Sequence, residues 1–135
     1  MIEQKTKIIL DTNFLLIPGQ SSFDIFEEIS KLMDEPYEVF IVDKTIDELK
    51  GLTKKGKVKD RVSAKIGIEL IDYKRIKKID SAKLESDLVD DMIIEVADKD
   101  TIVATIDKNL KRELLQKGYR VIEIVNKGYL RIKKK

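Results

Sequence analysis

Short apolar runs alternate with amphipathic segments along the chain, and this alternation restricts the fold more than any other feature of the sequence. The apolar runs are rich in β-branched residues and have the length of buried strands. They lie at residues 6–10, 37–42, 76–79, 101–106 and 120–124, with a last extended segment at 129–132. The segments between them place apolar residues at helical spacing. Strands that alternate with helices predict an α/β fold with a mainly parallel sheet covered on both faces.

The length and composition of the chain exclude many kinds of site. Its 135 residues fit one compact domain, and we expect a single domain over residues 1–135. The chain has no cysteine and no histidine, which excludes disulfides, thiolate or imidazole metal sites and Ser-His-Asp catalysis. Any metal ion must therefore be held by oxygen ligands.

The sequence carries no pattern typical of a membrane or export segment. Its longest apolar runs, such as Ile8-Ile9-Leu10, are far shorter than the roughly 18 residues that suggest a membrane span. The first residues lack a signal-peptide pattern. We therefore expect a cytoplasmic protein with no membrane partner.

Acidic residues stand where a site is expected in such a sheet, beyond the carboxyl ends of the strands. Asp11 follows the first predicted strand, and Asp107 follows the fourth. Glu48 lies one turn into the helix after the second strand, and Asp91 begins the helix before the fourth. Carboxylates that converge without cations repel one another, and a divalent cation relieves this repulsion. Oxygen ligands favour Mg²⁺ or Mn²⁺, whose chemistry points to phosphodiester hydrolysis by water.

Four short motifs carry these acids in a fixed order along the chain. They are Ile8-Ile9-Leu10-Asp11-Thr12-Asn13, Asp47-Glu48-Leu49, Asp90-Asp91-Met92-Ile93-Ile94-Glu95-Val96-Ala97 and Val103-Ala104-Thr105-Ile106-Asp107-Lys108-Asn109-Leu110. In this order and at these intervals, the motifs resemble those of the PIN-domain ribonucleases. The likeness covers most of the chain. Within the family it is greater to the ribosomal RNA processing nucleases of the small-subunit processome type than to the VapC toxins.

The resemblance implies roles for individual residues. The family's catalytic and metal-binding quartet corresponds to Asp11, Glu48, Asp91 and Asp107. Its supporting positions correspond to Asn13, Asp90, Thr105 and Asn109. Many family members carry a further acid where this chain has Asn109, and a neutral side chain there weakens a second metal site. The family's fold is a three-layer sandwich with strand order 3-2-1-4-5, which implies that the first and fourth strands are neighbours.

Each acid also has a simpler interpretation. The two acids that follow strands precede helical segments, and both fit helix N-caps. Thr45 and Glu48 have the spacing of a capping box. Asp91 also has the position of an ordinary acid in the first turn of a helix, where the helix dipole favours a negative charge. In that case Asp90 is the metal ligand, or neither residue binds metal.

The densest basic stretch of the chain follows Glu48. We assign RNA binding to Lys50, Lys54, Lys55, Lys57, Lys59 and Arg61. Lysines on a loop beside an acidic site bind phosphates without reading sequence. The alternative is an ordinary solvated surface.

The sequence thus predicts an Mg²⁺- or Mn²⁺-dependent endoribonuclease that cleaves single-stranded or locally unpaired RNA, and the resemblance favours precursor ribosomal RNA as its substrate. One alternative is a VapC-like toxin ribonuclease, which implies a small antitoxin partner. The other is a non-catalytic RNA-binding or ribosome-assembly module. The four acids argue against such a module, and the neutral Asn109 leaves it open. A homodimer is compatible with all three.

Overall fold

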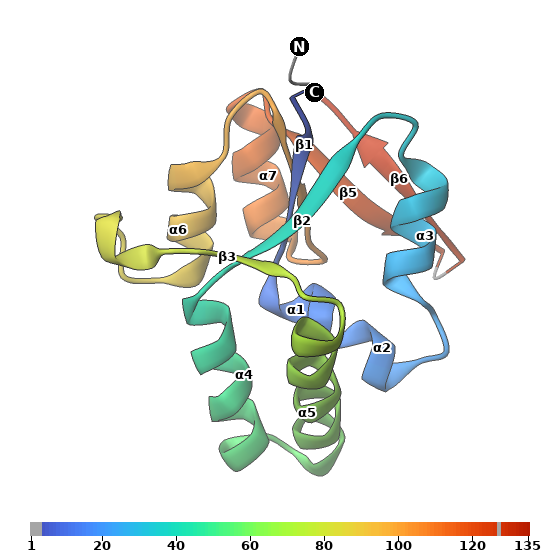
Figure 1. Cartoon of the computed structure of the whole chain (residues 1–135), viewed down its shortest axis with the longest axis vertical. Coiled ribbons are helices and arrows are strands. Elements are labelled where there is room, and N and C mark those ends of the chain that lie inside the picture. The colour runs from blue at the N-terminus through green and yellow to red at the C-terminus, as the bar shows by residue number, and fades with distance from the viewer. Residues whose placement is uncertain (1–3, 127) are drawn as a thin grey trace.

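The computed structural model describes residues 4–126 and 128–135, which are built around a six-stranded sheet (Figure 1). The strands are β1 (Thr6–Leu10), β2 (Tyr37–Val42), β3 (Lys77–Ile79), β4 (Thr101–Ala104), β5 (Arg120–Val125) and β6 (Tyr129–Lys133). Their order is β3-β2-β1-β4-β5-β6, in which only β6 runs antiparallel to its neighbour. The predicted α/β class and the order 3-2-1-4-5 are confirmed, and β6 extends the sheet at one edge.

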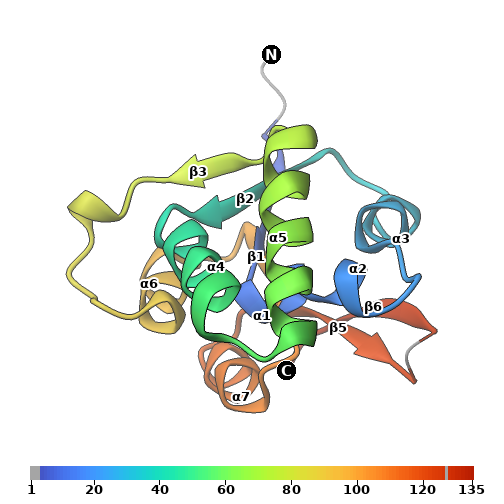
Figure 2. The same cartoon turned by 90° about the horizontal axis from the view of Figure 1, so that it is seen from below.

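Helices cover both faces of the sheet. They are α1 (Thr12–Leu15), α2 (Ile17–Gln20), α3 (Ile25–Leu32), α4 (Lys44–Lys55), α5 (Val58–Tyr73), α6 (Val89–Val96) and α7 (Lys108–Gln116), with a 3₁₀ turn at Ser81–Lys83. α6 and α7 pack on one face, and α2, α3 and α5 pack on the other (Figures 1 and 2). α4 and α5 form a hairpin that extends past the carboxyl ends of the strands (Figure 1). Within the described ranges, no helix combines the length and apolarity needed to cross a membrane.

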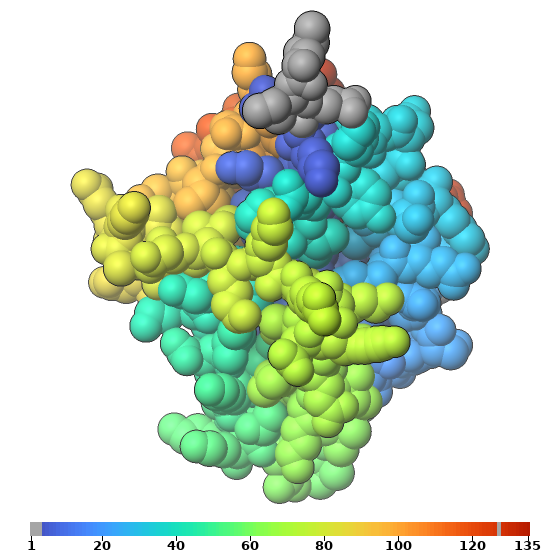
Figure 3. Space-filling view, in the orientation of Figure 1, coloured from blue at the N-terminus to red at the C-terminus, as the bar shows by residue number. Residues whose placement is uncertain are grey.

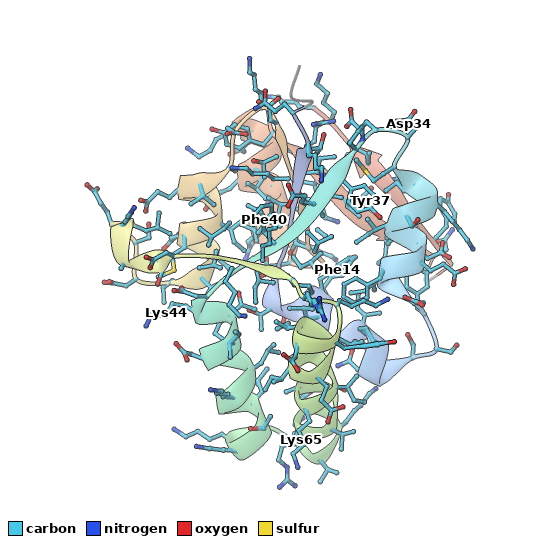
Figure 4. All side chains as sticks on the ribbon, viewed as in Figure 1. Phe14, Asp34, Tyr37, Phe40, Lys44 and Lys65 are labelled. Carbon is cyan, nitrogen blue, oxygen red and sulfur yellow. The ribbon has the colours of Figure 1, made fainter. Side chains whose placement is uncertain are left out.

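The sheet separates two apolar cores, as the alternation of side chains along a strand requires. Ile8 and Leu10 of β1 belong to one core, and Ile9 between them belongs to the other. Phe14 is fully buried in the first core (Figure 4). Because β1 is covered on both faces, the residue that follows it is held in a fixed position at the edge of the sheet.

The fourth strand is shorter than predicted. β4 ends at Ala104, and Ile106, expected in the core, is 40% exposed. The hydroxyl of Thr105 accepts a hydrogen bond from the amide of Asp107 at 3.0 Å, which turns the chain away from the sheet. The apolar pattern does not reveal this turn, because Ile106 continues the β-branched run.

The basic stretch forms a helical hairpin, and the predicted loop is wrong. α4 continues to Lys55 and α5 begins at Val58, so only residues 56 and 57 connect them. Gly56 ends α4, and its amide donates to the carbonyl of Leu52 at 3.0 Å. A Cβ atom at Gly56 would lie 2.8 Å from that carbonyl oxygen, so this tight connection needs glycine. The lysines are therefore displayed on a defined surface.

A nearly buried charge cluster attaches α7 to the sheet. Glu123 of β5 is 5% exposed and accepts hydrogen bonds from Lys111 at 2.9 Å and from Arg131 at 2.6 Å. Burial alone would raise the pKa of Glu123, but the hydrogen bonds from the two cations outweigh it and lower that pKa. Because Lys111 belongs to the first turns of α7, this cluster also fixes the start of that helix, where Asp107 lies.

Candidate active site

The carboxylate of Asp11 lies at the carboxyl end of β1, beside the end of β4. Asp11 is 2% exposed. One of its oxygens accepts the amide of Thr12 at 2.8 Å, and the other accepts the hydroxyl of Thr105 at 2.8 Å. Thr105 follows β4, so this second hydrogen bond joins the ends of the two central strands. Asp11 therefore caps α1, as the simpler interpretation held, and is also presented at the edge of the sheet.

The side chain of Asp107 is held close to the same point. The Thr105 hydroxyl that donates to Asp11 also accepts the amide of Asp107. One carboxylate oxygen of Asp107 accepts the amides of Asn109 at 2.8 Å and Leu110 at 3.1 Å, which caps α7. Capping engages one oxygen only. The same carboxylate can thus begin a helix and present its second oxygen to a ligand.

Glu48 does not form the capping box that its spacing with Thr45 suggested. α4 begins at Lys44 with Asp43 as its N-cap, two residues before the N-cap that the Thr45–Glu48 spacing suggested, and the hydroxyl of Thr45 is buried without a hydrogen-bond partner. Glu48 instead accepts a hydrogen bond from the hydroxyl of Thr12. Its carboxylate is therefore directed toward α1 and away from the first turn of its own helix.

The structure brings Asp90, rather than Asp91, to the other acids. α6 begins at Val89 and buries Val89, Met92 and Ile93. Successive helical residues are about 100° apart, so Asp90 flanks this buried face and Asp91 lies opposite it. Asp91 is accordingly exposed, while Asp90 is half-buried.

These side chains surround one open cavity of about 550 Å³. Its lining includes Asn13, Glu48, Lys55, Asp90 and Asp107, and Asp11 lies beneath it, bonded to Thr12 of the lining. Figure 2 views the molecule from this side and shows α1 with α4, α6 and α7 around it. We call the cavity, with Asp11, Glu48, Asp90 and Asp107, the acidic cleft.

Repulsion between carboxylates and burial determine the electrostatics of the acidic cleft. Among the described residues, the ion pairs include none of the four. Burial raises the pKa of Asp11 to about 6; the charges of Asp90 and Glu48 also raise it, and the hydrogen bond from Thr105 opposes them. Burial likewise raises the pKa of Asp90, with further contributions from the carboxylates of Asp107 and Glu48.

The chemistry of these donors suits a divalent cation. In the part of the chain that the structure describes, no three acidic side chains already stand close enough to share one ion. The acidic cleft contains carboxylate oxygens, and the chain has no histidine or cysteine that could add a nitrogen or sulfur ligand. Mg²⁺ and Mn²⁺ prefer such oxygen ligands.

The remaining predicted positions divide between the cleft and the solvent. Asn13 and Lys55 line the cleft. The exposed Asn109 is not among the lining residues and contributes its amide to Asp107. The α4–α5 hairpin exposes the other predicted RNA-binding residues: Lys50, Lys54, Lys57, Lys59 and Arg61. This hairpin forms the lower lobe of the molecule, from which long side chains such as the labelled Lys65 extend (Figures 3 and 4).

One residue of the site was missed from the sequence. Thr12, whose hydroxyl holds Glu48, was assigned no role of its own. No periodicity marks it, because its partner lies 36 residues away. The only available signal was its place between Asp11 and Asn13 in the first motif.

Comparisons with known proteins agree with this fold. Ribonuclease VapC4 of Methanocaldococcus jannaschii is 28% identical to this chain over 128 residues, which cover 93% of this chain and 95% of the relative. The PIN domain endonuclease Utp24 has a similar structure, with a TM-score of 0.72 and 23% identity over 96% of this chain and 92% of the other. This second likeness concerns the fold. Residues 8–127 match the family described as PIN like domain, and the chain therefore belongs to the PIN-like domain family.

Proposed function

We propose that this protein is a divalent-metal-dependent endoribonuclease that acts on single-stranded or locally unpaired RNA. The observation that carries the proposal is the acidic cleft, around which carboxylates from four separate elements gather and where burial and neighbouring carboxylates raise the pKa of Asp11 and Asp90. Carboxylates gathered in this way repel one another unless an ion joins them, and ionisable groups with shifted pKa values in a cleft are typical of functional sites. The relative named a ribonuclease supports RNA as the substrate.

Residues of the acidic cleft have distinct tasks in this proposal. Asp11, Asp90 and Asp107 hold the ion, with Glu48 beside them. When bound, such an ion makes water nucleophilic at neutral pH and offsets the charge that develops on the phosphate. The hydroxyls of Thr105 and Thr12 orient Asp11 and Glu48, so the ligands are restrained before the substrate arrives.

The shape and charge around the cleft favour an unpaired strand. The cleft is open to solvent and lies against the basic α4–α5 hairpin, whose Lys55 is part of its lining. Lysine ammonium groups bind successive phosphates of a flexible strand without selecting a sequence. Precursor ribosomal RNA is the substrate favoured by the motif likeness to processing nucleases.

The proposal is tested by cleavage of an end-labelled, unstructured RNA in Mg²⁺ or Mn²⁺. We expect chelation with EDTA to reduce the rate on the order of a hundredfold or more, and excess Mn²⁺ to restore it. Circular dichroism of the chelated protein checks that the fold survives. Cleavage that resists EDTA would exclude the metal mechanism. A folded protein that cleaves neither generic nor precursor RNA would support the assembly module instead.

A VapC-type toxin ribonuclease is a second candidate, because the relative named VapC4 matches this chain over almost its whole length. We nevertheless expect production of the protein in a bacterial host not to arrest growth, since a processing enzyme acts on selected precursors. Growth curves measure this directly, and the neighbouring genes should include no short antitoxin-like gene immediately upstream. Growth arrest that Asp11→Asn relieves, together with such a neighbour, would favour the toxin.

The basic hairpin is expected to contribute to RNA binding and not to the chemical step. Replacing Lys54, Lys57 and Lys59 by Gln removes up to three phosphate contacts, each adding roughly 0.7 to the slope of log affinity against log salt. The slope should flatten by up to about two units, while single-turnover cleavage at saturating RNA changes little. Lys55 is left unchanged because it lines the cleft.

A matched control replaces the three lysines at positions 133–135 by Gln. This variant loses the same three positive charges as the hairpin variant, but it loses them at the end of the chain. This control should leave the salt slope as it is in the parent. Equal slopes in the parent and both variants would show that the hairpin is an ordinary solvated surface and does not bind RNA.

A further inference from the structure

A second cavity lies beside the acidic cleft and takes no part in the proposed chemistry. Its volume is about 570 Å³, and residues from α2, α3, the first turn of α5 and β5 line it. Its apolar lining includes Ile17, Phe23, Ile106 and Ile124. Ile106 is 40% exposed and directly precedes Asp107 of the acidic cleft. We call this cavity the side groove.

The side groove and the acidic cleft are neighbours. Three stretches of the chain pass from one to the other within at most four residues, a span of at most roughly 14 Å even for a fully extended chain. In each stretch one residue lines the cleft and one lines the groove, and the pairs are Asp107 with Ile106, Lys55 with Lys59, and Asn13 with Ile17. A strand whose phosphate lies in the cleft can therefore place an adjacent nucleotide in the groove.

The wall between α2 and α5 is fixed before any ligand binds. A Cβ atom at Gly19 of α2 would lie 2.6 Å from the Cα of Ser63 in α5, so the two helices are in direct backbone contact. Similarly, a Cβ atom added at Gly67 of α5 would lie 3.1 Å from the carbonyl oxygen of Leu15 in α1. The α2–α5 side of the groove is thus held by direct backbone contact.

We propose that the side groove binds one unpaired nucleobase of the RNA, next to the phosphodiester bond in the acidic cleft. This inference rests on the proposed function. The faces of a base are flat and apolar, and they stack on Phe23 and on the exposed surface of Ile106. The edge of a base carries N–H groups, which find acceptors in the hydroxyl of Ser22 and in the carboxylate oxygen of Asp24 that does not cap α3.

The charges around the groove favour a base over a phosphate. Asp24, Glu27 and Glu28 line it, and a phosphate would be repelled by these carboxylates. Lys31 lies 3.8 Å from the carboxylate of Glu27 and 3.3 Å from that of Glu28, which moderates the negative potential without reversing it. Among the described residues, Lys59 is the one basic residue of the lining, and it can contact the backbone of the same nucleotide.

The test compares two probes on the Asp11→Asn chain in Mg²⁺, so that neither is cleaved. One is a fluorescein-labelled, unstructured RNA of about ten nucleotides, and the other is a base-free tetrahydrofuran phosphate chain of the same length. Fluorescence anisotropy should show that the RNA binds about tenfold more tightly. Ile106→Ala and Phe23→Ala should each reduce this preference to less than about threefold, with unchanged affinity for the base-free chain.

The matched control is Ile132→Ala on β6. Ile132 is the same residue type and is 36% exposed, but it is not part of the groove lining. Its replacement should leave the tenfold preference intact. A preference that survives both groove variants, or a parent that binds both probes equally, would overturn the inference and leave a protein segment as the occupant to examine. A chain that binds neither probe would instead contradict the proposed function itself.

Discussion

The Asp11→Asn variant is expected to lose RNA cleavage by about a hundredfold or more and, without metal ions, to be more stable than the parent chain. Asparagine keeps the size of the side chain and its hydrogen-bonding oxygen, so the fold should persist. It removes the negative charge that the ion requires. The two effects have opposite signs because the same carboxylate serves catalysis and opposes folding.

The expected gain in stability follows from the pKa of Asp11. Burial raises this pKa to about 6 in the folded chain, from an ordinary value of 3.8. The folded state therefore holds a proton that the unfolded state releases, and stability falls as the pH rises from 3.8 to about 6. At neutral pH the loss is on the order of 3 kcal/mol. Asparagine avoids it but gives up one acceptor for Thr12 or Thr105, which leaves a net gain of about 1–2 kcal/mol.

Urea unfolding in EDTA measures this gain. The difference between Asp11→Asn and the parent should be largest at pH 7 and should shrink below about pH 4, where the parent carboxyl is also neutral. Asp72→Asn, a change of the same kind at an exposed position of α5, should alter stability by less than about 0.5 kcal/mol and leave cleavage intact. A less stable Asp11→Asn at pH 7, or one that still cleaves RNA, would contradict the role assigned to Asp11.

The arrangement of the sheet could be predicted because it depends on patterns that are local and strong. Four of the five parallel strands are continuous or nearly continuous apolar runs in the sequence. Parallel strands separated by helices must present their carboxyl ends at the same edge of the sheet. That rule directed attention to Asp11 and Asp107, which the structure joins through Thr105. The order of the strands came from the family resemblance and not from the residues themselves.

The facing of individual side chains could not be predicted in the same way. Adjacent residues of a helix face about 100° apart, so the choice between Asp90 and Asp91 depends on which side chains of α6 are buried, and the short motif did not settle this. The hydrogen bond between Thr12 and Glu48 links residues far apart in the chain, so no local pattern encodes it. Ile106 was misplaced for a similar reason, because the hydrogen bonds of Thr105 end β4 while the apolar run continues.

A second large effect on RNA cleavage is expected at two adjacent acids of α6. Asp90→Asn is expected to lower cleavage by about a hundredfold or more, whereas Asp91→Asn should change it by less than about threefold. Asp90 lines the acidic cleft, and the charges of Asp107 and Glu48 act on it. Asp91 is exposed on the opposite side of the helix. Isothermal titration with Mn²⁺ should show weakened binding for Asp90→Asn alone.

The two variants control for each other unusually well. Both remove one negative charge from the first turn of α6, so the interaction with the helix dipole and the net charge of the protein change equally. Both replace a carboxylate by an amide of the same volume, so packing is unaffected. Any difference between them must therefore come from the direction in which the side chain points. The opposite result, with Asp91→Asn inactive and Asp90→Asn active, would restore the ligand role to Asp91 as the motif resemblance implied, and it would require α6 to turn by about 100° when the ion binds.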